Sequence, residues 1–271
     1  MLGGAPFNVA WHLHALGDQP RFISRVGDDA LGKIILGSMN DWGMDTASVQ
    51  IDPTHQTGRV DIEVIDQEPH YTITPDCAYD FIDSASIASP DNCSVLYHGS
   101  LGLRNKVSRN ALEKLAHNSG AGIFLDVNLR APWWQQDEVH HWLNQARWAK
   151  LNHDELRLLD FDSGNLENDI ARLQSRFELD HVILTRAEQG AIVRDITGEL
   201  YNIIPDKITN FVDAVGAGDA FTAIYIHGLV SGWPITDTLR IAQGFASKVI
   251  GLRGATTTDR GFYRDYIDPN K

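Results

Sequence analysis

Residues 213–221 read Asp213-Ala214-Val215-Gly216-Ala217-Gly218-Asp219-Ala220-Phe221 and join two regions of different pattern. Residues 200–212 before them are β-rich, and residues 217–230 after them have a helical pattern. The small residues 216–218 let the backbone approach a ligand closely. Because the first amides of a helix lack internal partners and carry positive dipole charge, they attract anions. The pattern therefore predicts an anion-binding turn with Asp219 in the first helical turn beside it.

A carboxylate beside such a turn suggests a base that removes a proton from an attacking hydroxyl. Phosphoryl transfer fits this arrangement, because positioning and charge stabilisation supply most of its catalysis. A short Gly-x-Gly-Asp sequence is equally typical of a strand-to-helix turn in which the acid stabilises the start of the helix. The rest of the chain must decide between the two interpretations.

The composition is that of an ordinary soluble globular protein, with 271 residues of which 43% are hydrophobic and 22% are charged. We expect it in the cytoplasm, because there is no N-terminal signal, no apolar run near the roughly 20 residues of a membrane helix, and few cysteines. Only Cys77 and Cys93 are present. The net charge of −13 argues against nucleic acid and membrane as partners, but it leaves room for a nucleotide.

Hydrophobic periodicity predicts strands and helices in alternation. Strand patterns occur at residues 21–26, 95–98, 123–127, 148–151 and 182–185, with a hairpin at 190–194 and 200–204. Helical patterns occur at residues 6–16, 31–42, 170–177, 217–230 and 235–249, and near 112–115. We therefore expect one α/β domain over residues 1–271, with helices layered on a sheet.

Residues 60–65 and 71–74 read as a half-exposed antiparallel pair of strands. The pair is either a lid over a site, spanning about residues 57–74, or a plain hairpin at a sheet edge, and these residues favour neither. Polar residues also follow the predicted strands, at Asn128 and Arg130, at Asn152 and Glu155, and at Thr185. Because ligands collect at the carboxyl ends of strands in α/β sheets, this order favours a shared site.

Two sequence signatures stand in order along the chain. The first is Gly3-Gly4-Ala5-Pro6-Phe7-Asn8-Val9-Ala10, with Gly17 and Gly27-Asp28-Asp29 downstream, and residues 213–219 are the second. Between them lie Asp126-Val127-Asn128-Leu129-Arg130 and Lys150-Leu151-Asn152-His153-Asp154-Glu155. Over residues 3–255 the chain resembles the ribokinase-like carbohydrate kinases, the PfkB family. The residues of its motifs are most similar to those of bacterial fructokinases. The resemblance implies a layered α/β/α fold with a mostly parallel central sheet and a small β lid.

The resemblance also implies roles for individual residues. Asp219 matches the catalytic base, and the amides of Gly216, Ala217 and Gly218 match the anion hole. The motif of Asn152 and Glu155 organises Mg²⁺ through water in the family, although a helix N-cap with a first-turn acid gives the same sequence. The positions expected to meet the sugar are Gly3, Gly4, Asn8 and Arg130, with a tight turn before a helix or a surface arginine as the alternatives.

The nucleotide is expected on the other side of the site, and ATP is the nucleotide that the resemblance implies. The matching positions are Asn152, Thr185, Gly190, Asp213 and Gly218. The resemblance leaves open K⁺ at backbone oxygens near Asp213 and residues 253–255. It also leaves open a homodimer, because lid strands in the family often pair between subunits.

Three features depart from the family pattern. Ala214 stands where Thr is usual, and Ile224 replaces a small residue. Before the Gly-Gly pair the family carries a strand, an acidic sugar-binding residue and lid strands, whereas this chain has only Met1 and Leu2. We therefore expect the N-terminal strand and part of the lid to be absent, which would leave an open sheet edge.

The leading hypothesis is an ATP-dependent sugar kinase that phosphorylates a primary hydroxyl of fructose, with ribose, 2-keto-3-deoxygluconate or a nucleoside as alternative acceptors. A non-catalytic sugar- or nucleotide-binding homologue is the second hypothesis, which the short start and Ala214 motivate and Asp219 disfavours. A dinucleotide-dependent oxidoreductase is disfavoured, because no Gly-x-Gly-x-x-Gly follows an early strand with an acid about 20 residues on.

Overall fold

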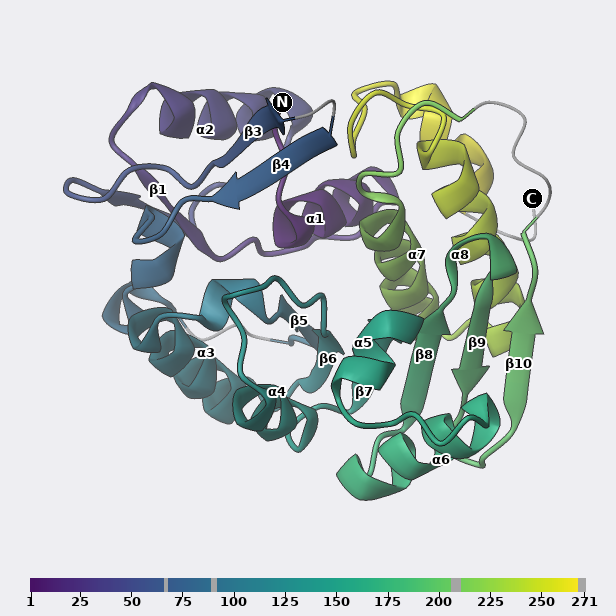
Figure 1. The fold of residues 1–271 in the computed structure, drawn as a ribbon. Coiled ribbons are helices and arrows are strands. Elements are labelled where there is room, and N and C mark those ends of the chain that lie inside the picture. Colours follow the sequence, from purple (N-terminus) through teal and green to yellow (C-terminus); the bar gives the residue numbers. More distant parts are fainter. Residues whose placement is uncertain (66–67, 89–91, 206–210, 268–271) are drawn as a thin grey trace. The chain divides into compact units, whose positions relative to one another are not determined.

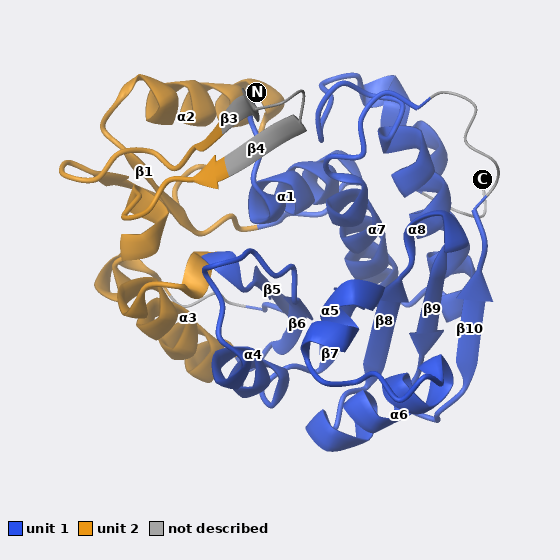
Figure 2. Cartoon of the chain, in the orientation of Figure 1, with its two compact units in different colours: residues 1–20, 92–101, 120–271 blue, residues 21–91, 102–119 orange. Residues whose placement is uncertain are grey.

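The computed structural model describes residues 1–65, 68–88, 92–205 and 211–267, with the backbone alone at residues 62–65 and 68–71. The chain forms two compact units, which Figure 2 colours separately. Unit 1 comprises residues 1–20, 92–101 and 120–271, and unit 2 comprises residues 21–91 and 102–119. Each unit is therefore assembled from segments that are separated in the sequence.

Unit 1 is built on a six-stranded sheet in the order β10-β9-β8-β7-β6-β5 (Figure 1). The strands are β5 Val95–Gly99, β6 Gly122–Asp126, β7 Trp148–Asn152, β8 His181–Thr185, β9 Ala191–Arg194 and β10 Leu200–Ile203. Neighbours from β5 to β8 run parallel, and β9 is antiparallel to both β8 and β10. The middle of β7 and of β8 is a continuous run of buried residues, as in a parallel sheet covered on both faces. The predicted mostly parallel sheet is confirmed.

Helices cover this sheet. They are α1 Ala5–Ala15, α4 Gln136–Leu143, α5 His153–Leu158, α6 Leu166–Phe177, α7 Ala217–Ser231 and α8 Ile235–Val249, with 3₁₀ turns at Ala187–Gln189 and Arg260–Tyr266. A further 3₁₀ turn, Leu101–Leu103, lies where the chain passes from unit 1 to unit 2. Both α1 and α8 pack on α7, α8 also contacts β9 and β10, and α6 packs on β8. Residues 220–228 of α7 are all buried, which a helix enclosed by other elements requires. The expected layered α/β architecture is therefore present in unit 1.

The strand expected before the glycine turn is shorter than its sequence pattern. β10 ends at Ile203, and Pro205 follows soon after, a residue that cannot donate a hydrogen bond to a sheet. Residues 206–210 lie outside the described part, and residues 211–216 carry no strand. The predicted β-rich run is therefore wrong for residues 204, 205, 211 and 212, and the glycine turn does not directly follow a strand.

The described residues of unit 2 form a parallel pair of short strands, two helices and a hairpin. Its elements are β1 Ser24–Gly27, α2 Ala30–Trp42, β2 Val49–Asp52, β3 Val60–Ile65, β4 Glu68–Ile73, 3₁₀ turns at Ala78–Phe81 and Ser84–Ser86, and α3 Lys106–Ser119. The strand predicted at residues 21–26 begins only at Ser24 and pairs with β2, a strand that the sequence pattern did not predict. The antiparallel pairing of β3 with β4 is confirmed. Its role as a lid stays a prediction.

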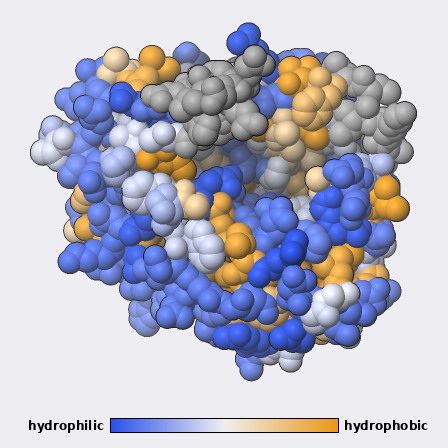
Figure 3. All heavy atoms as spheres, in the orientation of Figure 1, coloured by the Kyte–Doolittle hydropathy of each residue, from blue (hydrophilic) through white to orange (hydrophobic). Residues whose placement is uncertain are grey.

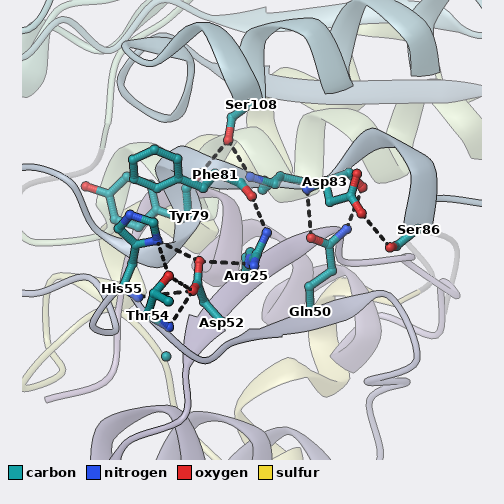
Figure 4. A network of polar contacts seen from close by, with 12 residues as sticks. Arg25, Gln50, Asp52, Thr54, His55, Tyr79, Phe81, Asp83, Ser86 and Ser108 are labelled. Carbon is teal, nitrogen blue, oxygen red and sulfur yellow. Dashed lines mark hydrogen bonds and ion pairs between the residues drawn. The ribbon is translucent and has the colours of Figure 1, made fainter.

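A polar network joins β2 of unit 2 to the loops around it (Figure 4). Asp52 is 1% exposed, and it accepts hydrogen bonds from Thr54 and His55 and lies 3.0 Å from Arg25 Nε. Burial would raise the pKa of Asp52, but these hydrogen bonds outweigh it and hold the pKa well below its usual range. Arg25 also donates to the Phe81 carbonyl at 2.6 Å, so one carboxylate fixes two loops of unit 2.

The surface carries mostly hydrophilic residues on the face in view, with hydrophobic residues in small groups between them (Figure 3). Within the described ranges, no helix has both the length and the hydropathy to span a membrane.

Candidate active site

The start of α7 is the glycine turn of the sequence. Gly216 is the N-cap, with a left-handed φ of 81°, and a Cβ there would lie 2.3 Å from the Cβ of Ala255. Only glycine fits this position without strain. Among the described residues, the Gly216 and Gly218 amides have no hydrogen-bond partner, whereas the Ala217 amide donates to the Ala214 carbonyl at 3.3 Å. Two of the three amides expected in an anion hole are thus unbonded.

Asp219 lies in the first turn of α7, beside these amides. Its Oδ2 accepts a hydrogen bond of 2.7 Å from Asn8 Nδ2, across 211 residues of sequence. Burial raises the pKa of the Asp219 carboxyl to about 6; the Asn8 hydrogen bond lowers it, the charge of Asp126 raises it, and those of Lys150 and Arg130 lower it. A carboxyl with this pKa is ionised at neutral pH and is a stronger base than an ordinary aspartate.

Asn8 is presented by the first turn of α1. The helix begins after Gly4, whose φ of 118° suits glycine, and a proline occupies its first turn. Asn8 is 3% exposed, and its Oδ1 is buried without a hydrogen-bond partner in the described part of the chain. Gly3 lies close to Asn8: a Cβ at Gly3 would be 3.9 Å from Asn8 Oδ1. Since an unpaired buried acceptor costs free energy, Asn8 Oδ1 is ready to accept a hydrogen bond from a ligand.

A buried ion pair lies next to the glycine turn. Asp126 and Lys150 are register partners on β6 and β7, and Lys150 Nζ is 2.7 Å from Asp126 Oδ2. A Cβ on Gly218 would lie 3.6 Å from the same Nζ. The Thr222 hydroxyl is 3.0 Å from Asp126 Oδ2 and 2.9 Å from the Gly218 carbonyl, and its single proton can serve only one of them at a time. The pair therefore connects the sheet to the start of α7.

Tyr97 on β5 brings a second unpartnered polar atom to this region. Its hydroxyl is buried and has no hydrogen-bond partner among the described residues. Burial raises the pKa of Tyr97 well above its usual value, and the charges of Asp126 and Asp219 raise it further. The hydroxyl therefore stays protonated and can donate a hydrogen bond.

Asn152 and Glu155 form a capping box at the start of α5. Asn152 Oδ1 accepts a hydrogen bond from the backbone N–H of Glu155 at 2.9 Å. In return, Glu155 Oε2 accepts one from the backbone N–H of Asn152 at 2.9 Å. The second carboxylate oxygen, Oε1, accepts from the Leu129 amide at 2.7 Å. Burial raises the pKa of Glu155, which is 5% exposed. The N-cap interpretation of this motif is confirmed, and Glu155 also ties the loop after β6 to α5.

Arg130 and Asp213 make local contacts with their chain neighbours. Arg130 is exposed, and its Nη1 donates to the carbonyl of Leu129 at 2.9 Å. It is near enough to Asp219 for its charge to lower the pKa of that carboxyl. Asp213 Oδ1 accepts from the Val215 amide at 3.0 Å and thereby shapes the approach to the glycine turn.

Thr185 lies next to Asn152 in the sheet, because the two are register partners on β8 and β7. Gly190 is explained by local geometry: its φ is 82°, and a Cβ there would lie 1.9 Å from the carbonyl oxygen of Ile203. The structure therefore brings Asn152 and Thr185 together, as expected for one side of a shared site. The glycine at position 190 is required by the local backbone geometry.

Three residues of this site were not assigned a role from the sequence: Tyr97, Asp126 and Lys150. From the sequence, Asp126 and Lys150 were included only as members of longer motifs, and Tyr97 was included only as a residue of a predicted strand. A charged residue inside each of two apolar strands was the available signal, because a buried charge requires a partner.

The chain matches a known protein family over nearly its whole length. A family model described as pfkB family carbohydrate kinase matches residues 1–260. The fructokinase of Escherichia coli is 29% identical over 272 residues, which cover 94% of this chain and 87% of that protein.

Solved structures share the fold. A double mutant of fructokinase from Vibrio cholerae O395, in its fructose, ADP and potassium ion bound form, matches with a TM-score of 0.85 at 23% identity and covers 98% of this chain and 90% of that chain. Aminoimidazole riboside kinase from Salmonella enterica, complexed with aminoimidazole riboside and an ATP analog, matches with a TM-score of 0.82 at 23% identity, covering 98% and 92%. The expected ribokinase-like fold is confirmed. Because the family match extends over nearly the whole chain, the chain belongs to the pfkB family of carbohydrate kinases and is a sugar kinase.

Proposed function

We propose that the protein transfers the γ-phosphoryl group of ATP to a primary hydroxyl of a small sugar, with fructose as the acceptor. The observation that carries the proposal is the Asp219 carboxyl, whose pKa is raised to about 6 and which lies beside unbonded amides at the start of α7. The similarity to fructokinases supports the choice of fructose.

In this mechanism Asp219 takes the proton of the sugar hydroxyl as its oxygen attacks the γ-phosphorus. The new O–P bond forms while the bond to the bridging oxygen breaks, and ADP leaves. The amides of Gly216 and Gly218 stabilise the negative charge on the transferred group, since fixed donors need no reorganisation during the reaction. Asp219 then loses the proton to water. Asn8 holds the carboxylate in place through its amide group.

The sugar is held by the two unpartnered polar atoms of the site. Asn8 Oδ1 accepts a hydrogen bond and the Tyr97 hydroxyl donates one, which together suit a ligand that is rich in hydroxyls. Gly3 and Gly4 let the backbone approach the same ligand, and Arg130 lies on the exposed side, where it can reach the sugar or a phosphate.

Mg²⁺ fits this site only through water at Glu155. Both carboxylate oxygens of Glu155 already accept a backbone N–H and the side chain is buried, whereas Asn152 is exposed. A hard cation that keeps several waters suits this arrangement, and it would neutralise phosphate charge. Bound K⁺ would add positive charge near Asp213 and residues 253–255. The potassium ion in the Vibrio cholerae structure supports this part of the proposal.

A riboside is the second candidate acceptor. The riboside kinase of Salmonella enterica matches this fold almost as well as the fructokinase does. Fructose and ribosides both offer a primary hydroxyl, so the base and the amides would act on them in the same way.

The test is ADP release with ATP, Mg²⁺ and K⁺ against fructose, ribose, 2-keto-3-deoxygluconate and a nucleoside. We expect fructose to give the highest kcat/KM, and we expect Asp219→Ala to abolish turnover while ATP binding, measured by calorimetry, stays nearly unchanged. A higher kcat/KM for a nucleoside would replace fructose with the second acceptor class. Comparable turnover by Asp219→Ala would contradict the assignment of the base.

A further inference from the structure

Lys150 is a buried cation that the mechanism above leaves unused. Its side chain is 7% exposed, and that of its partner Asp126 is 3% exposed. The ammonium group has three N–H donors, and the hydrogen bond to Asp126 Oδ2 at 2.7 Å occupies one of them. Among the described residues no other partner of Nζ is found. Since buried donors are normally satisfied, two N–H groups of Lys150 are available for a ligand.

The position of Lys150 indicates which ligand this is. Its Nζ lies 3.6 Å from the Cβ position of Gly218, so it adjoins the unbonded amides at the start of α7. Asn152, two residues further along β7, lies on the same face of the strand. The charge of Lys150 lowers the pKa of both Asp219 and Glu155. Lys150 is thus within electrostatic reach of the base on one side and of the expected nucleotide motif on the other.

We propose that Lys150 binds the transferred phosphoryl group and stabilises its charge in the transition state. The inference rests on the proposed function. A compact ammonium group is a point charge that suits phosphate, and burial strengthens its interaction because water does not screen it. Lys150 therefore completes, from the sheet, the anion hole that Gly216 and Gly218 begin from the helix.

Asp126 is a positioning residue in this proposal. It takes one N–H of Lys150, and the Thr222 hydroxyl lies 3.0 Å from the same carboxylate oxygen. Asp126 thereby fixes the ammonium group against the turn. Its own negative charge raises the pKa of Asp219, so the ion pair also adjusts the basicity of the base.

The first experiment compares Lys150→Met with the wild type and with Lys33→Met. Lys33 is a matched control, because its side chain is 74% exposed and it lies on α2 of unit 2. We expect kcat to fall roughly 10²–10³-fold in Lys150→Met, as for loss of one oxyanion-hole donor, with the sugar KM changed less than roughly threefold. Lys33→Met should keep the wild-type kcat. A kcat for Lys150→Met within threefold of wild type overturns the inference.

A pH profile supplies a readout that a purely structural role would not move. Because the charge of Lys150 lowers the pKa of Asp219, its removal should shift the acid limb of kcat/KM to higher pH. An unshifted limb in a folded Lys150→Met variant shows that the ammonium group lies too far from the reacting groups to stabilise the transferred phosphoryl group, and overturns the inference.

The single variant leaves Asp126 as a buried charge without its partner, which can prevent folding. The double variant Asp126→Asn with Lys150→Met removes both charges and keeps the fold testable. We expect this folded double variant to lose kcat to the same extent as Lys150→Met. Recovery of wild-type kcat in the double variant would mean that the ion pair is only structural.

Binding separates this inference from the proposed function. Lys150→Met should weaken binding of a non-hydrolysable ATP analogue at least tenfold and leave ADP binding unchanged, because only the analogue carries the γ-phosphoryl group. If the wild type phosphorylates no sugar, the proposed function fails, and the analogue-to-ADP comparison still decides whether Lys150 binds the phosphoryl group. Equal losses for both nucleotides would overturn the inference.

Discussion

Burial of Asp219 sets the acid limit expected for the proposed reaction, and the hydrogen bond from Asn8 moderates it. Because the pKa of Asp219 is about 6, we expect kcat/KM to fall as the pH drops through 6 and the base becomes protonated. The Asn8 bond favours the ionised carboxyl, so Asn8→Ala should move this limb to higher pH and raise the sugar KM more than the ATP KM. The pH dependence of the steady-state rate from pH 5 to 8 measures both effects.

Tyr97→Phe is the matched control for this prediction. The Tyr97 hydroxyl makes no hydrogen bond to Asp219, so its loss should raise the sugar KM and leave the acid limb near pH 6. An acid limb for Asn8→Ala that coincides with that of Tyr97→Phe would show that the Asn8 amide does not tune the base.

Candidate residues in short motifs were easier to identify from the sequence than residues that meet only through packing. Asp219 and Asn8 stand in short motifs whose residue types already indicate a base and a polar ligand. The charge inside each of two apolar strands indicated that Asp126 and Lys150 need partners, but not that they pair with each other, because they are 24 residues apart and meet only once β6 and β7 are in register. The unpartnered Tyr97 hydroxyl could not be predicted either, because a missing hydrogen bond depends on the positions of distant side chains.

At the scale of the element, α7 depends on its glycine N-cap. Gly216→Ala would place a Cβ 2.3 Å from that of Ala255 in a left-handed conformation. We expect the free energy of unfolding to fall by about 1–3 kcal/mol and kcat to fall at least tenfold, because the two unbonded amides would move. Urea denaturation and steady-state kinetics check the two effects.

Gly244→Ala on the exposed face of α8 is the control for the same substitution. No atom lies within 4 Å of its Cβ position, so alanine should raise the free energy of unfolding by up to about 1 kcal/mol through helix propensity. Wild-type kcat and stability in Gly216→Ala would show that the turn tolerates a side chain.

Elements with long periodic patterns were predicted well, and short or irregular ones were not. The patterns at residues 235–249 and 217–230 correspond closely to α8 and α7. β2 was missed because its four residues have a burial pattern that does not alternate. The strand expected at residues 200–212 stops at Ile203, because β-rich composition does not supply a pairing partner.

At the scale of the whole molecule, two buried histidines link stability to pH. Burial lowers the pKa of His12 and of His98 to about 4. Because the unfolded chain binds these protons near pH 6.5 and the folded chain does not, stability is lost as the pH falls from 6.5 towards 4. We expect about 2 kcal/mol to be lost between pH 7 and pH 5 for each histidine.

Urea denaturation of the wild type and of His98→Gln at both pH values tests this effect. The difference between pH 7 and pH 5 should be smaller in His98→Gln, and comparison of the two proteins cancels the opposite contribution of Asp219. An identical difference would show that His98 does not take part.

The boundaries between the two compact units could not be recognised in the sequence. Unit 2 is inserted in two segments, residues 21–91 and 102–119, and no linker composition marks where the chain passes from one unit to the other. Composition and periodicity are local properties, whereas the division depends on which distant segments share a core.

The contact between Asn8 and Asp219 has a consequence for synthesis of the protein. The two residues are 211 positions apart, so a ribosome that adds about 5–20 residues per second makes Asp219 roughly 10–40 s after Asn8. A growing chain therefore carries the Asn8 side-chain amide long before it carries the Asp219 carboxylate. In the proposed mechanism no phosphoryl transfer can occur before translation has passed residue 219, so a chain interrupted earlier would lack the base.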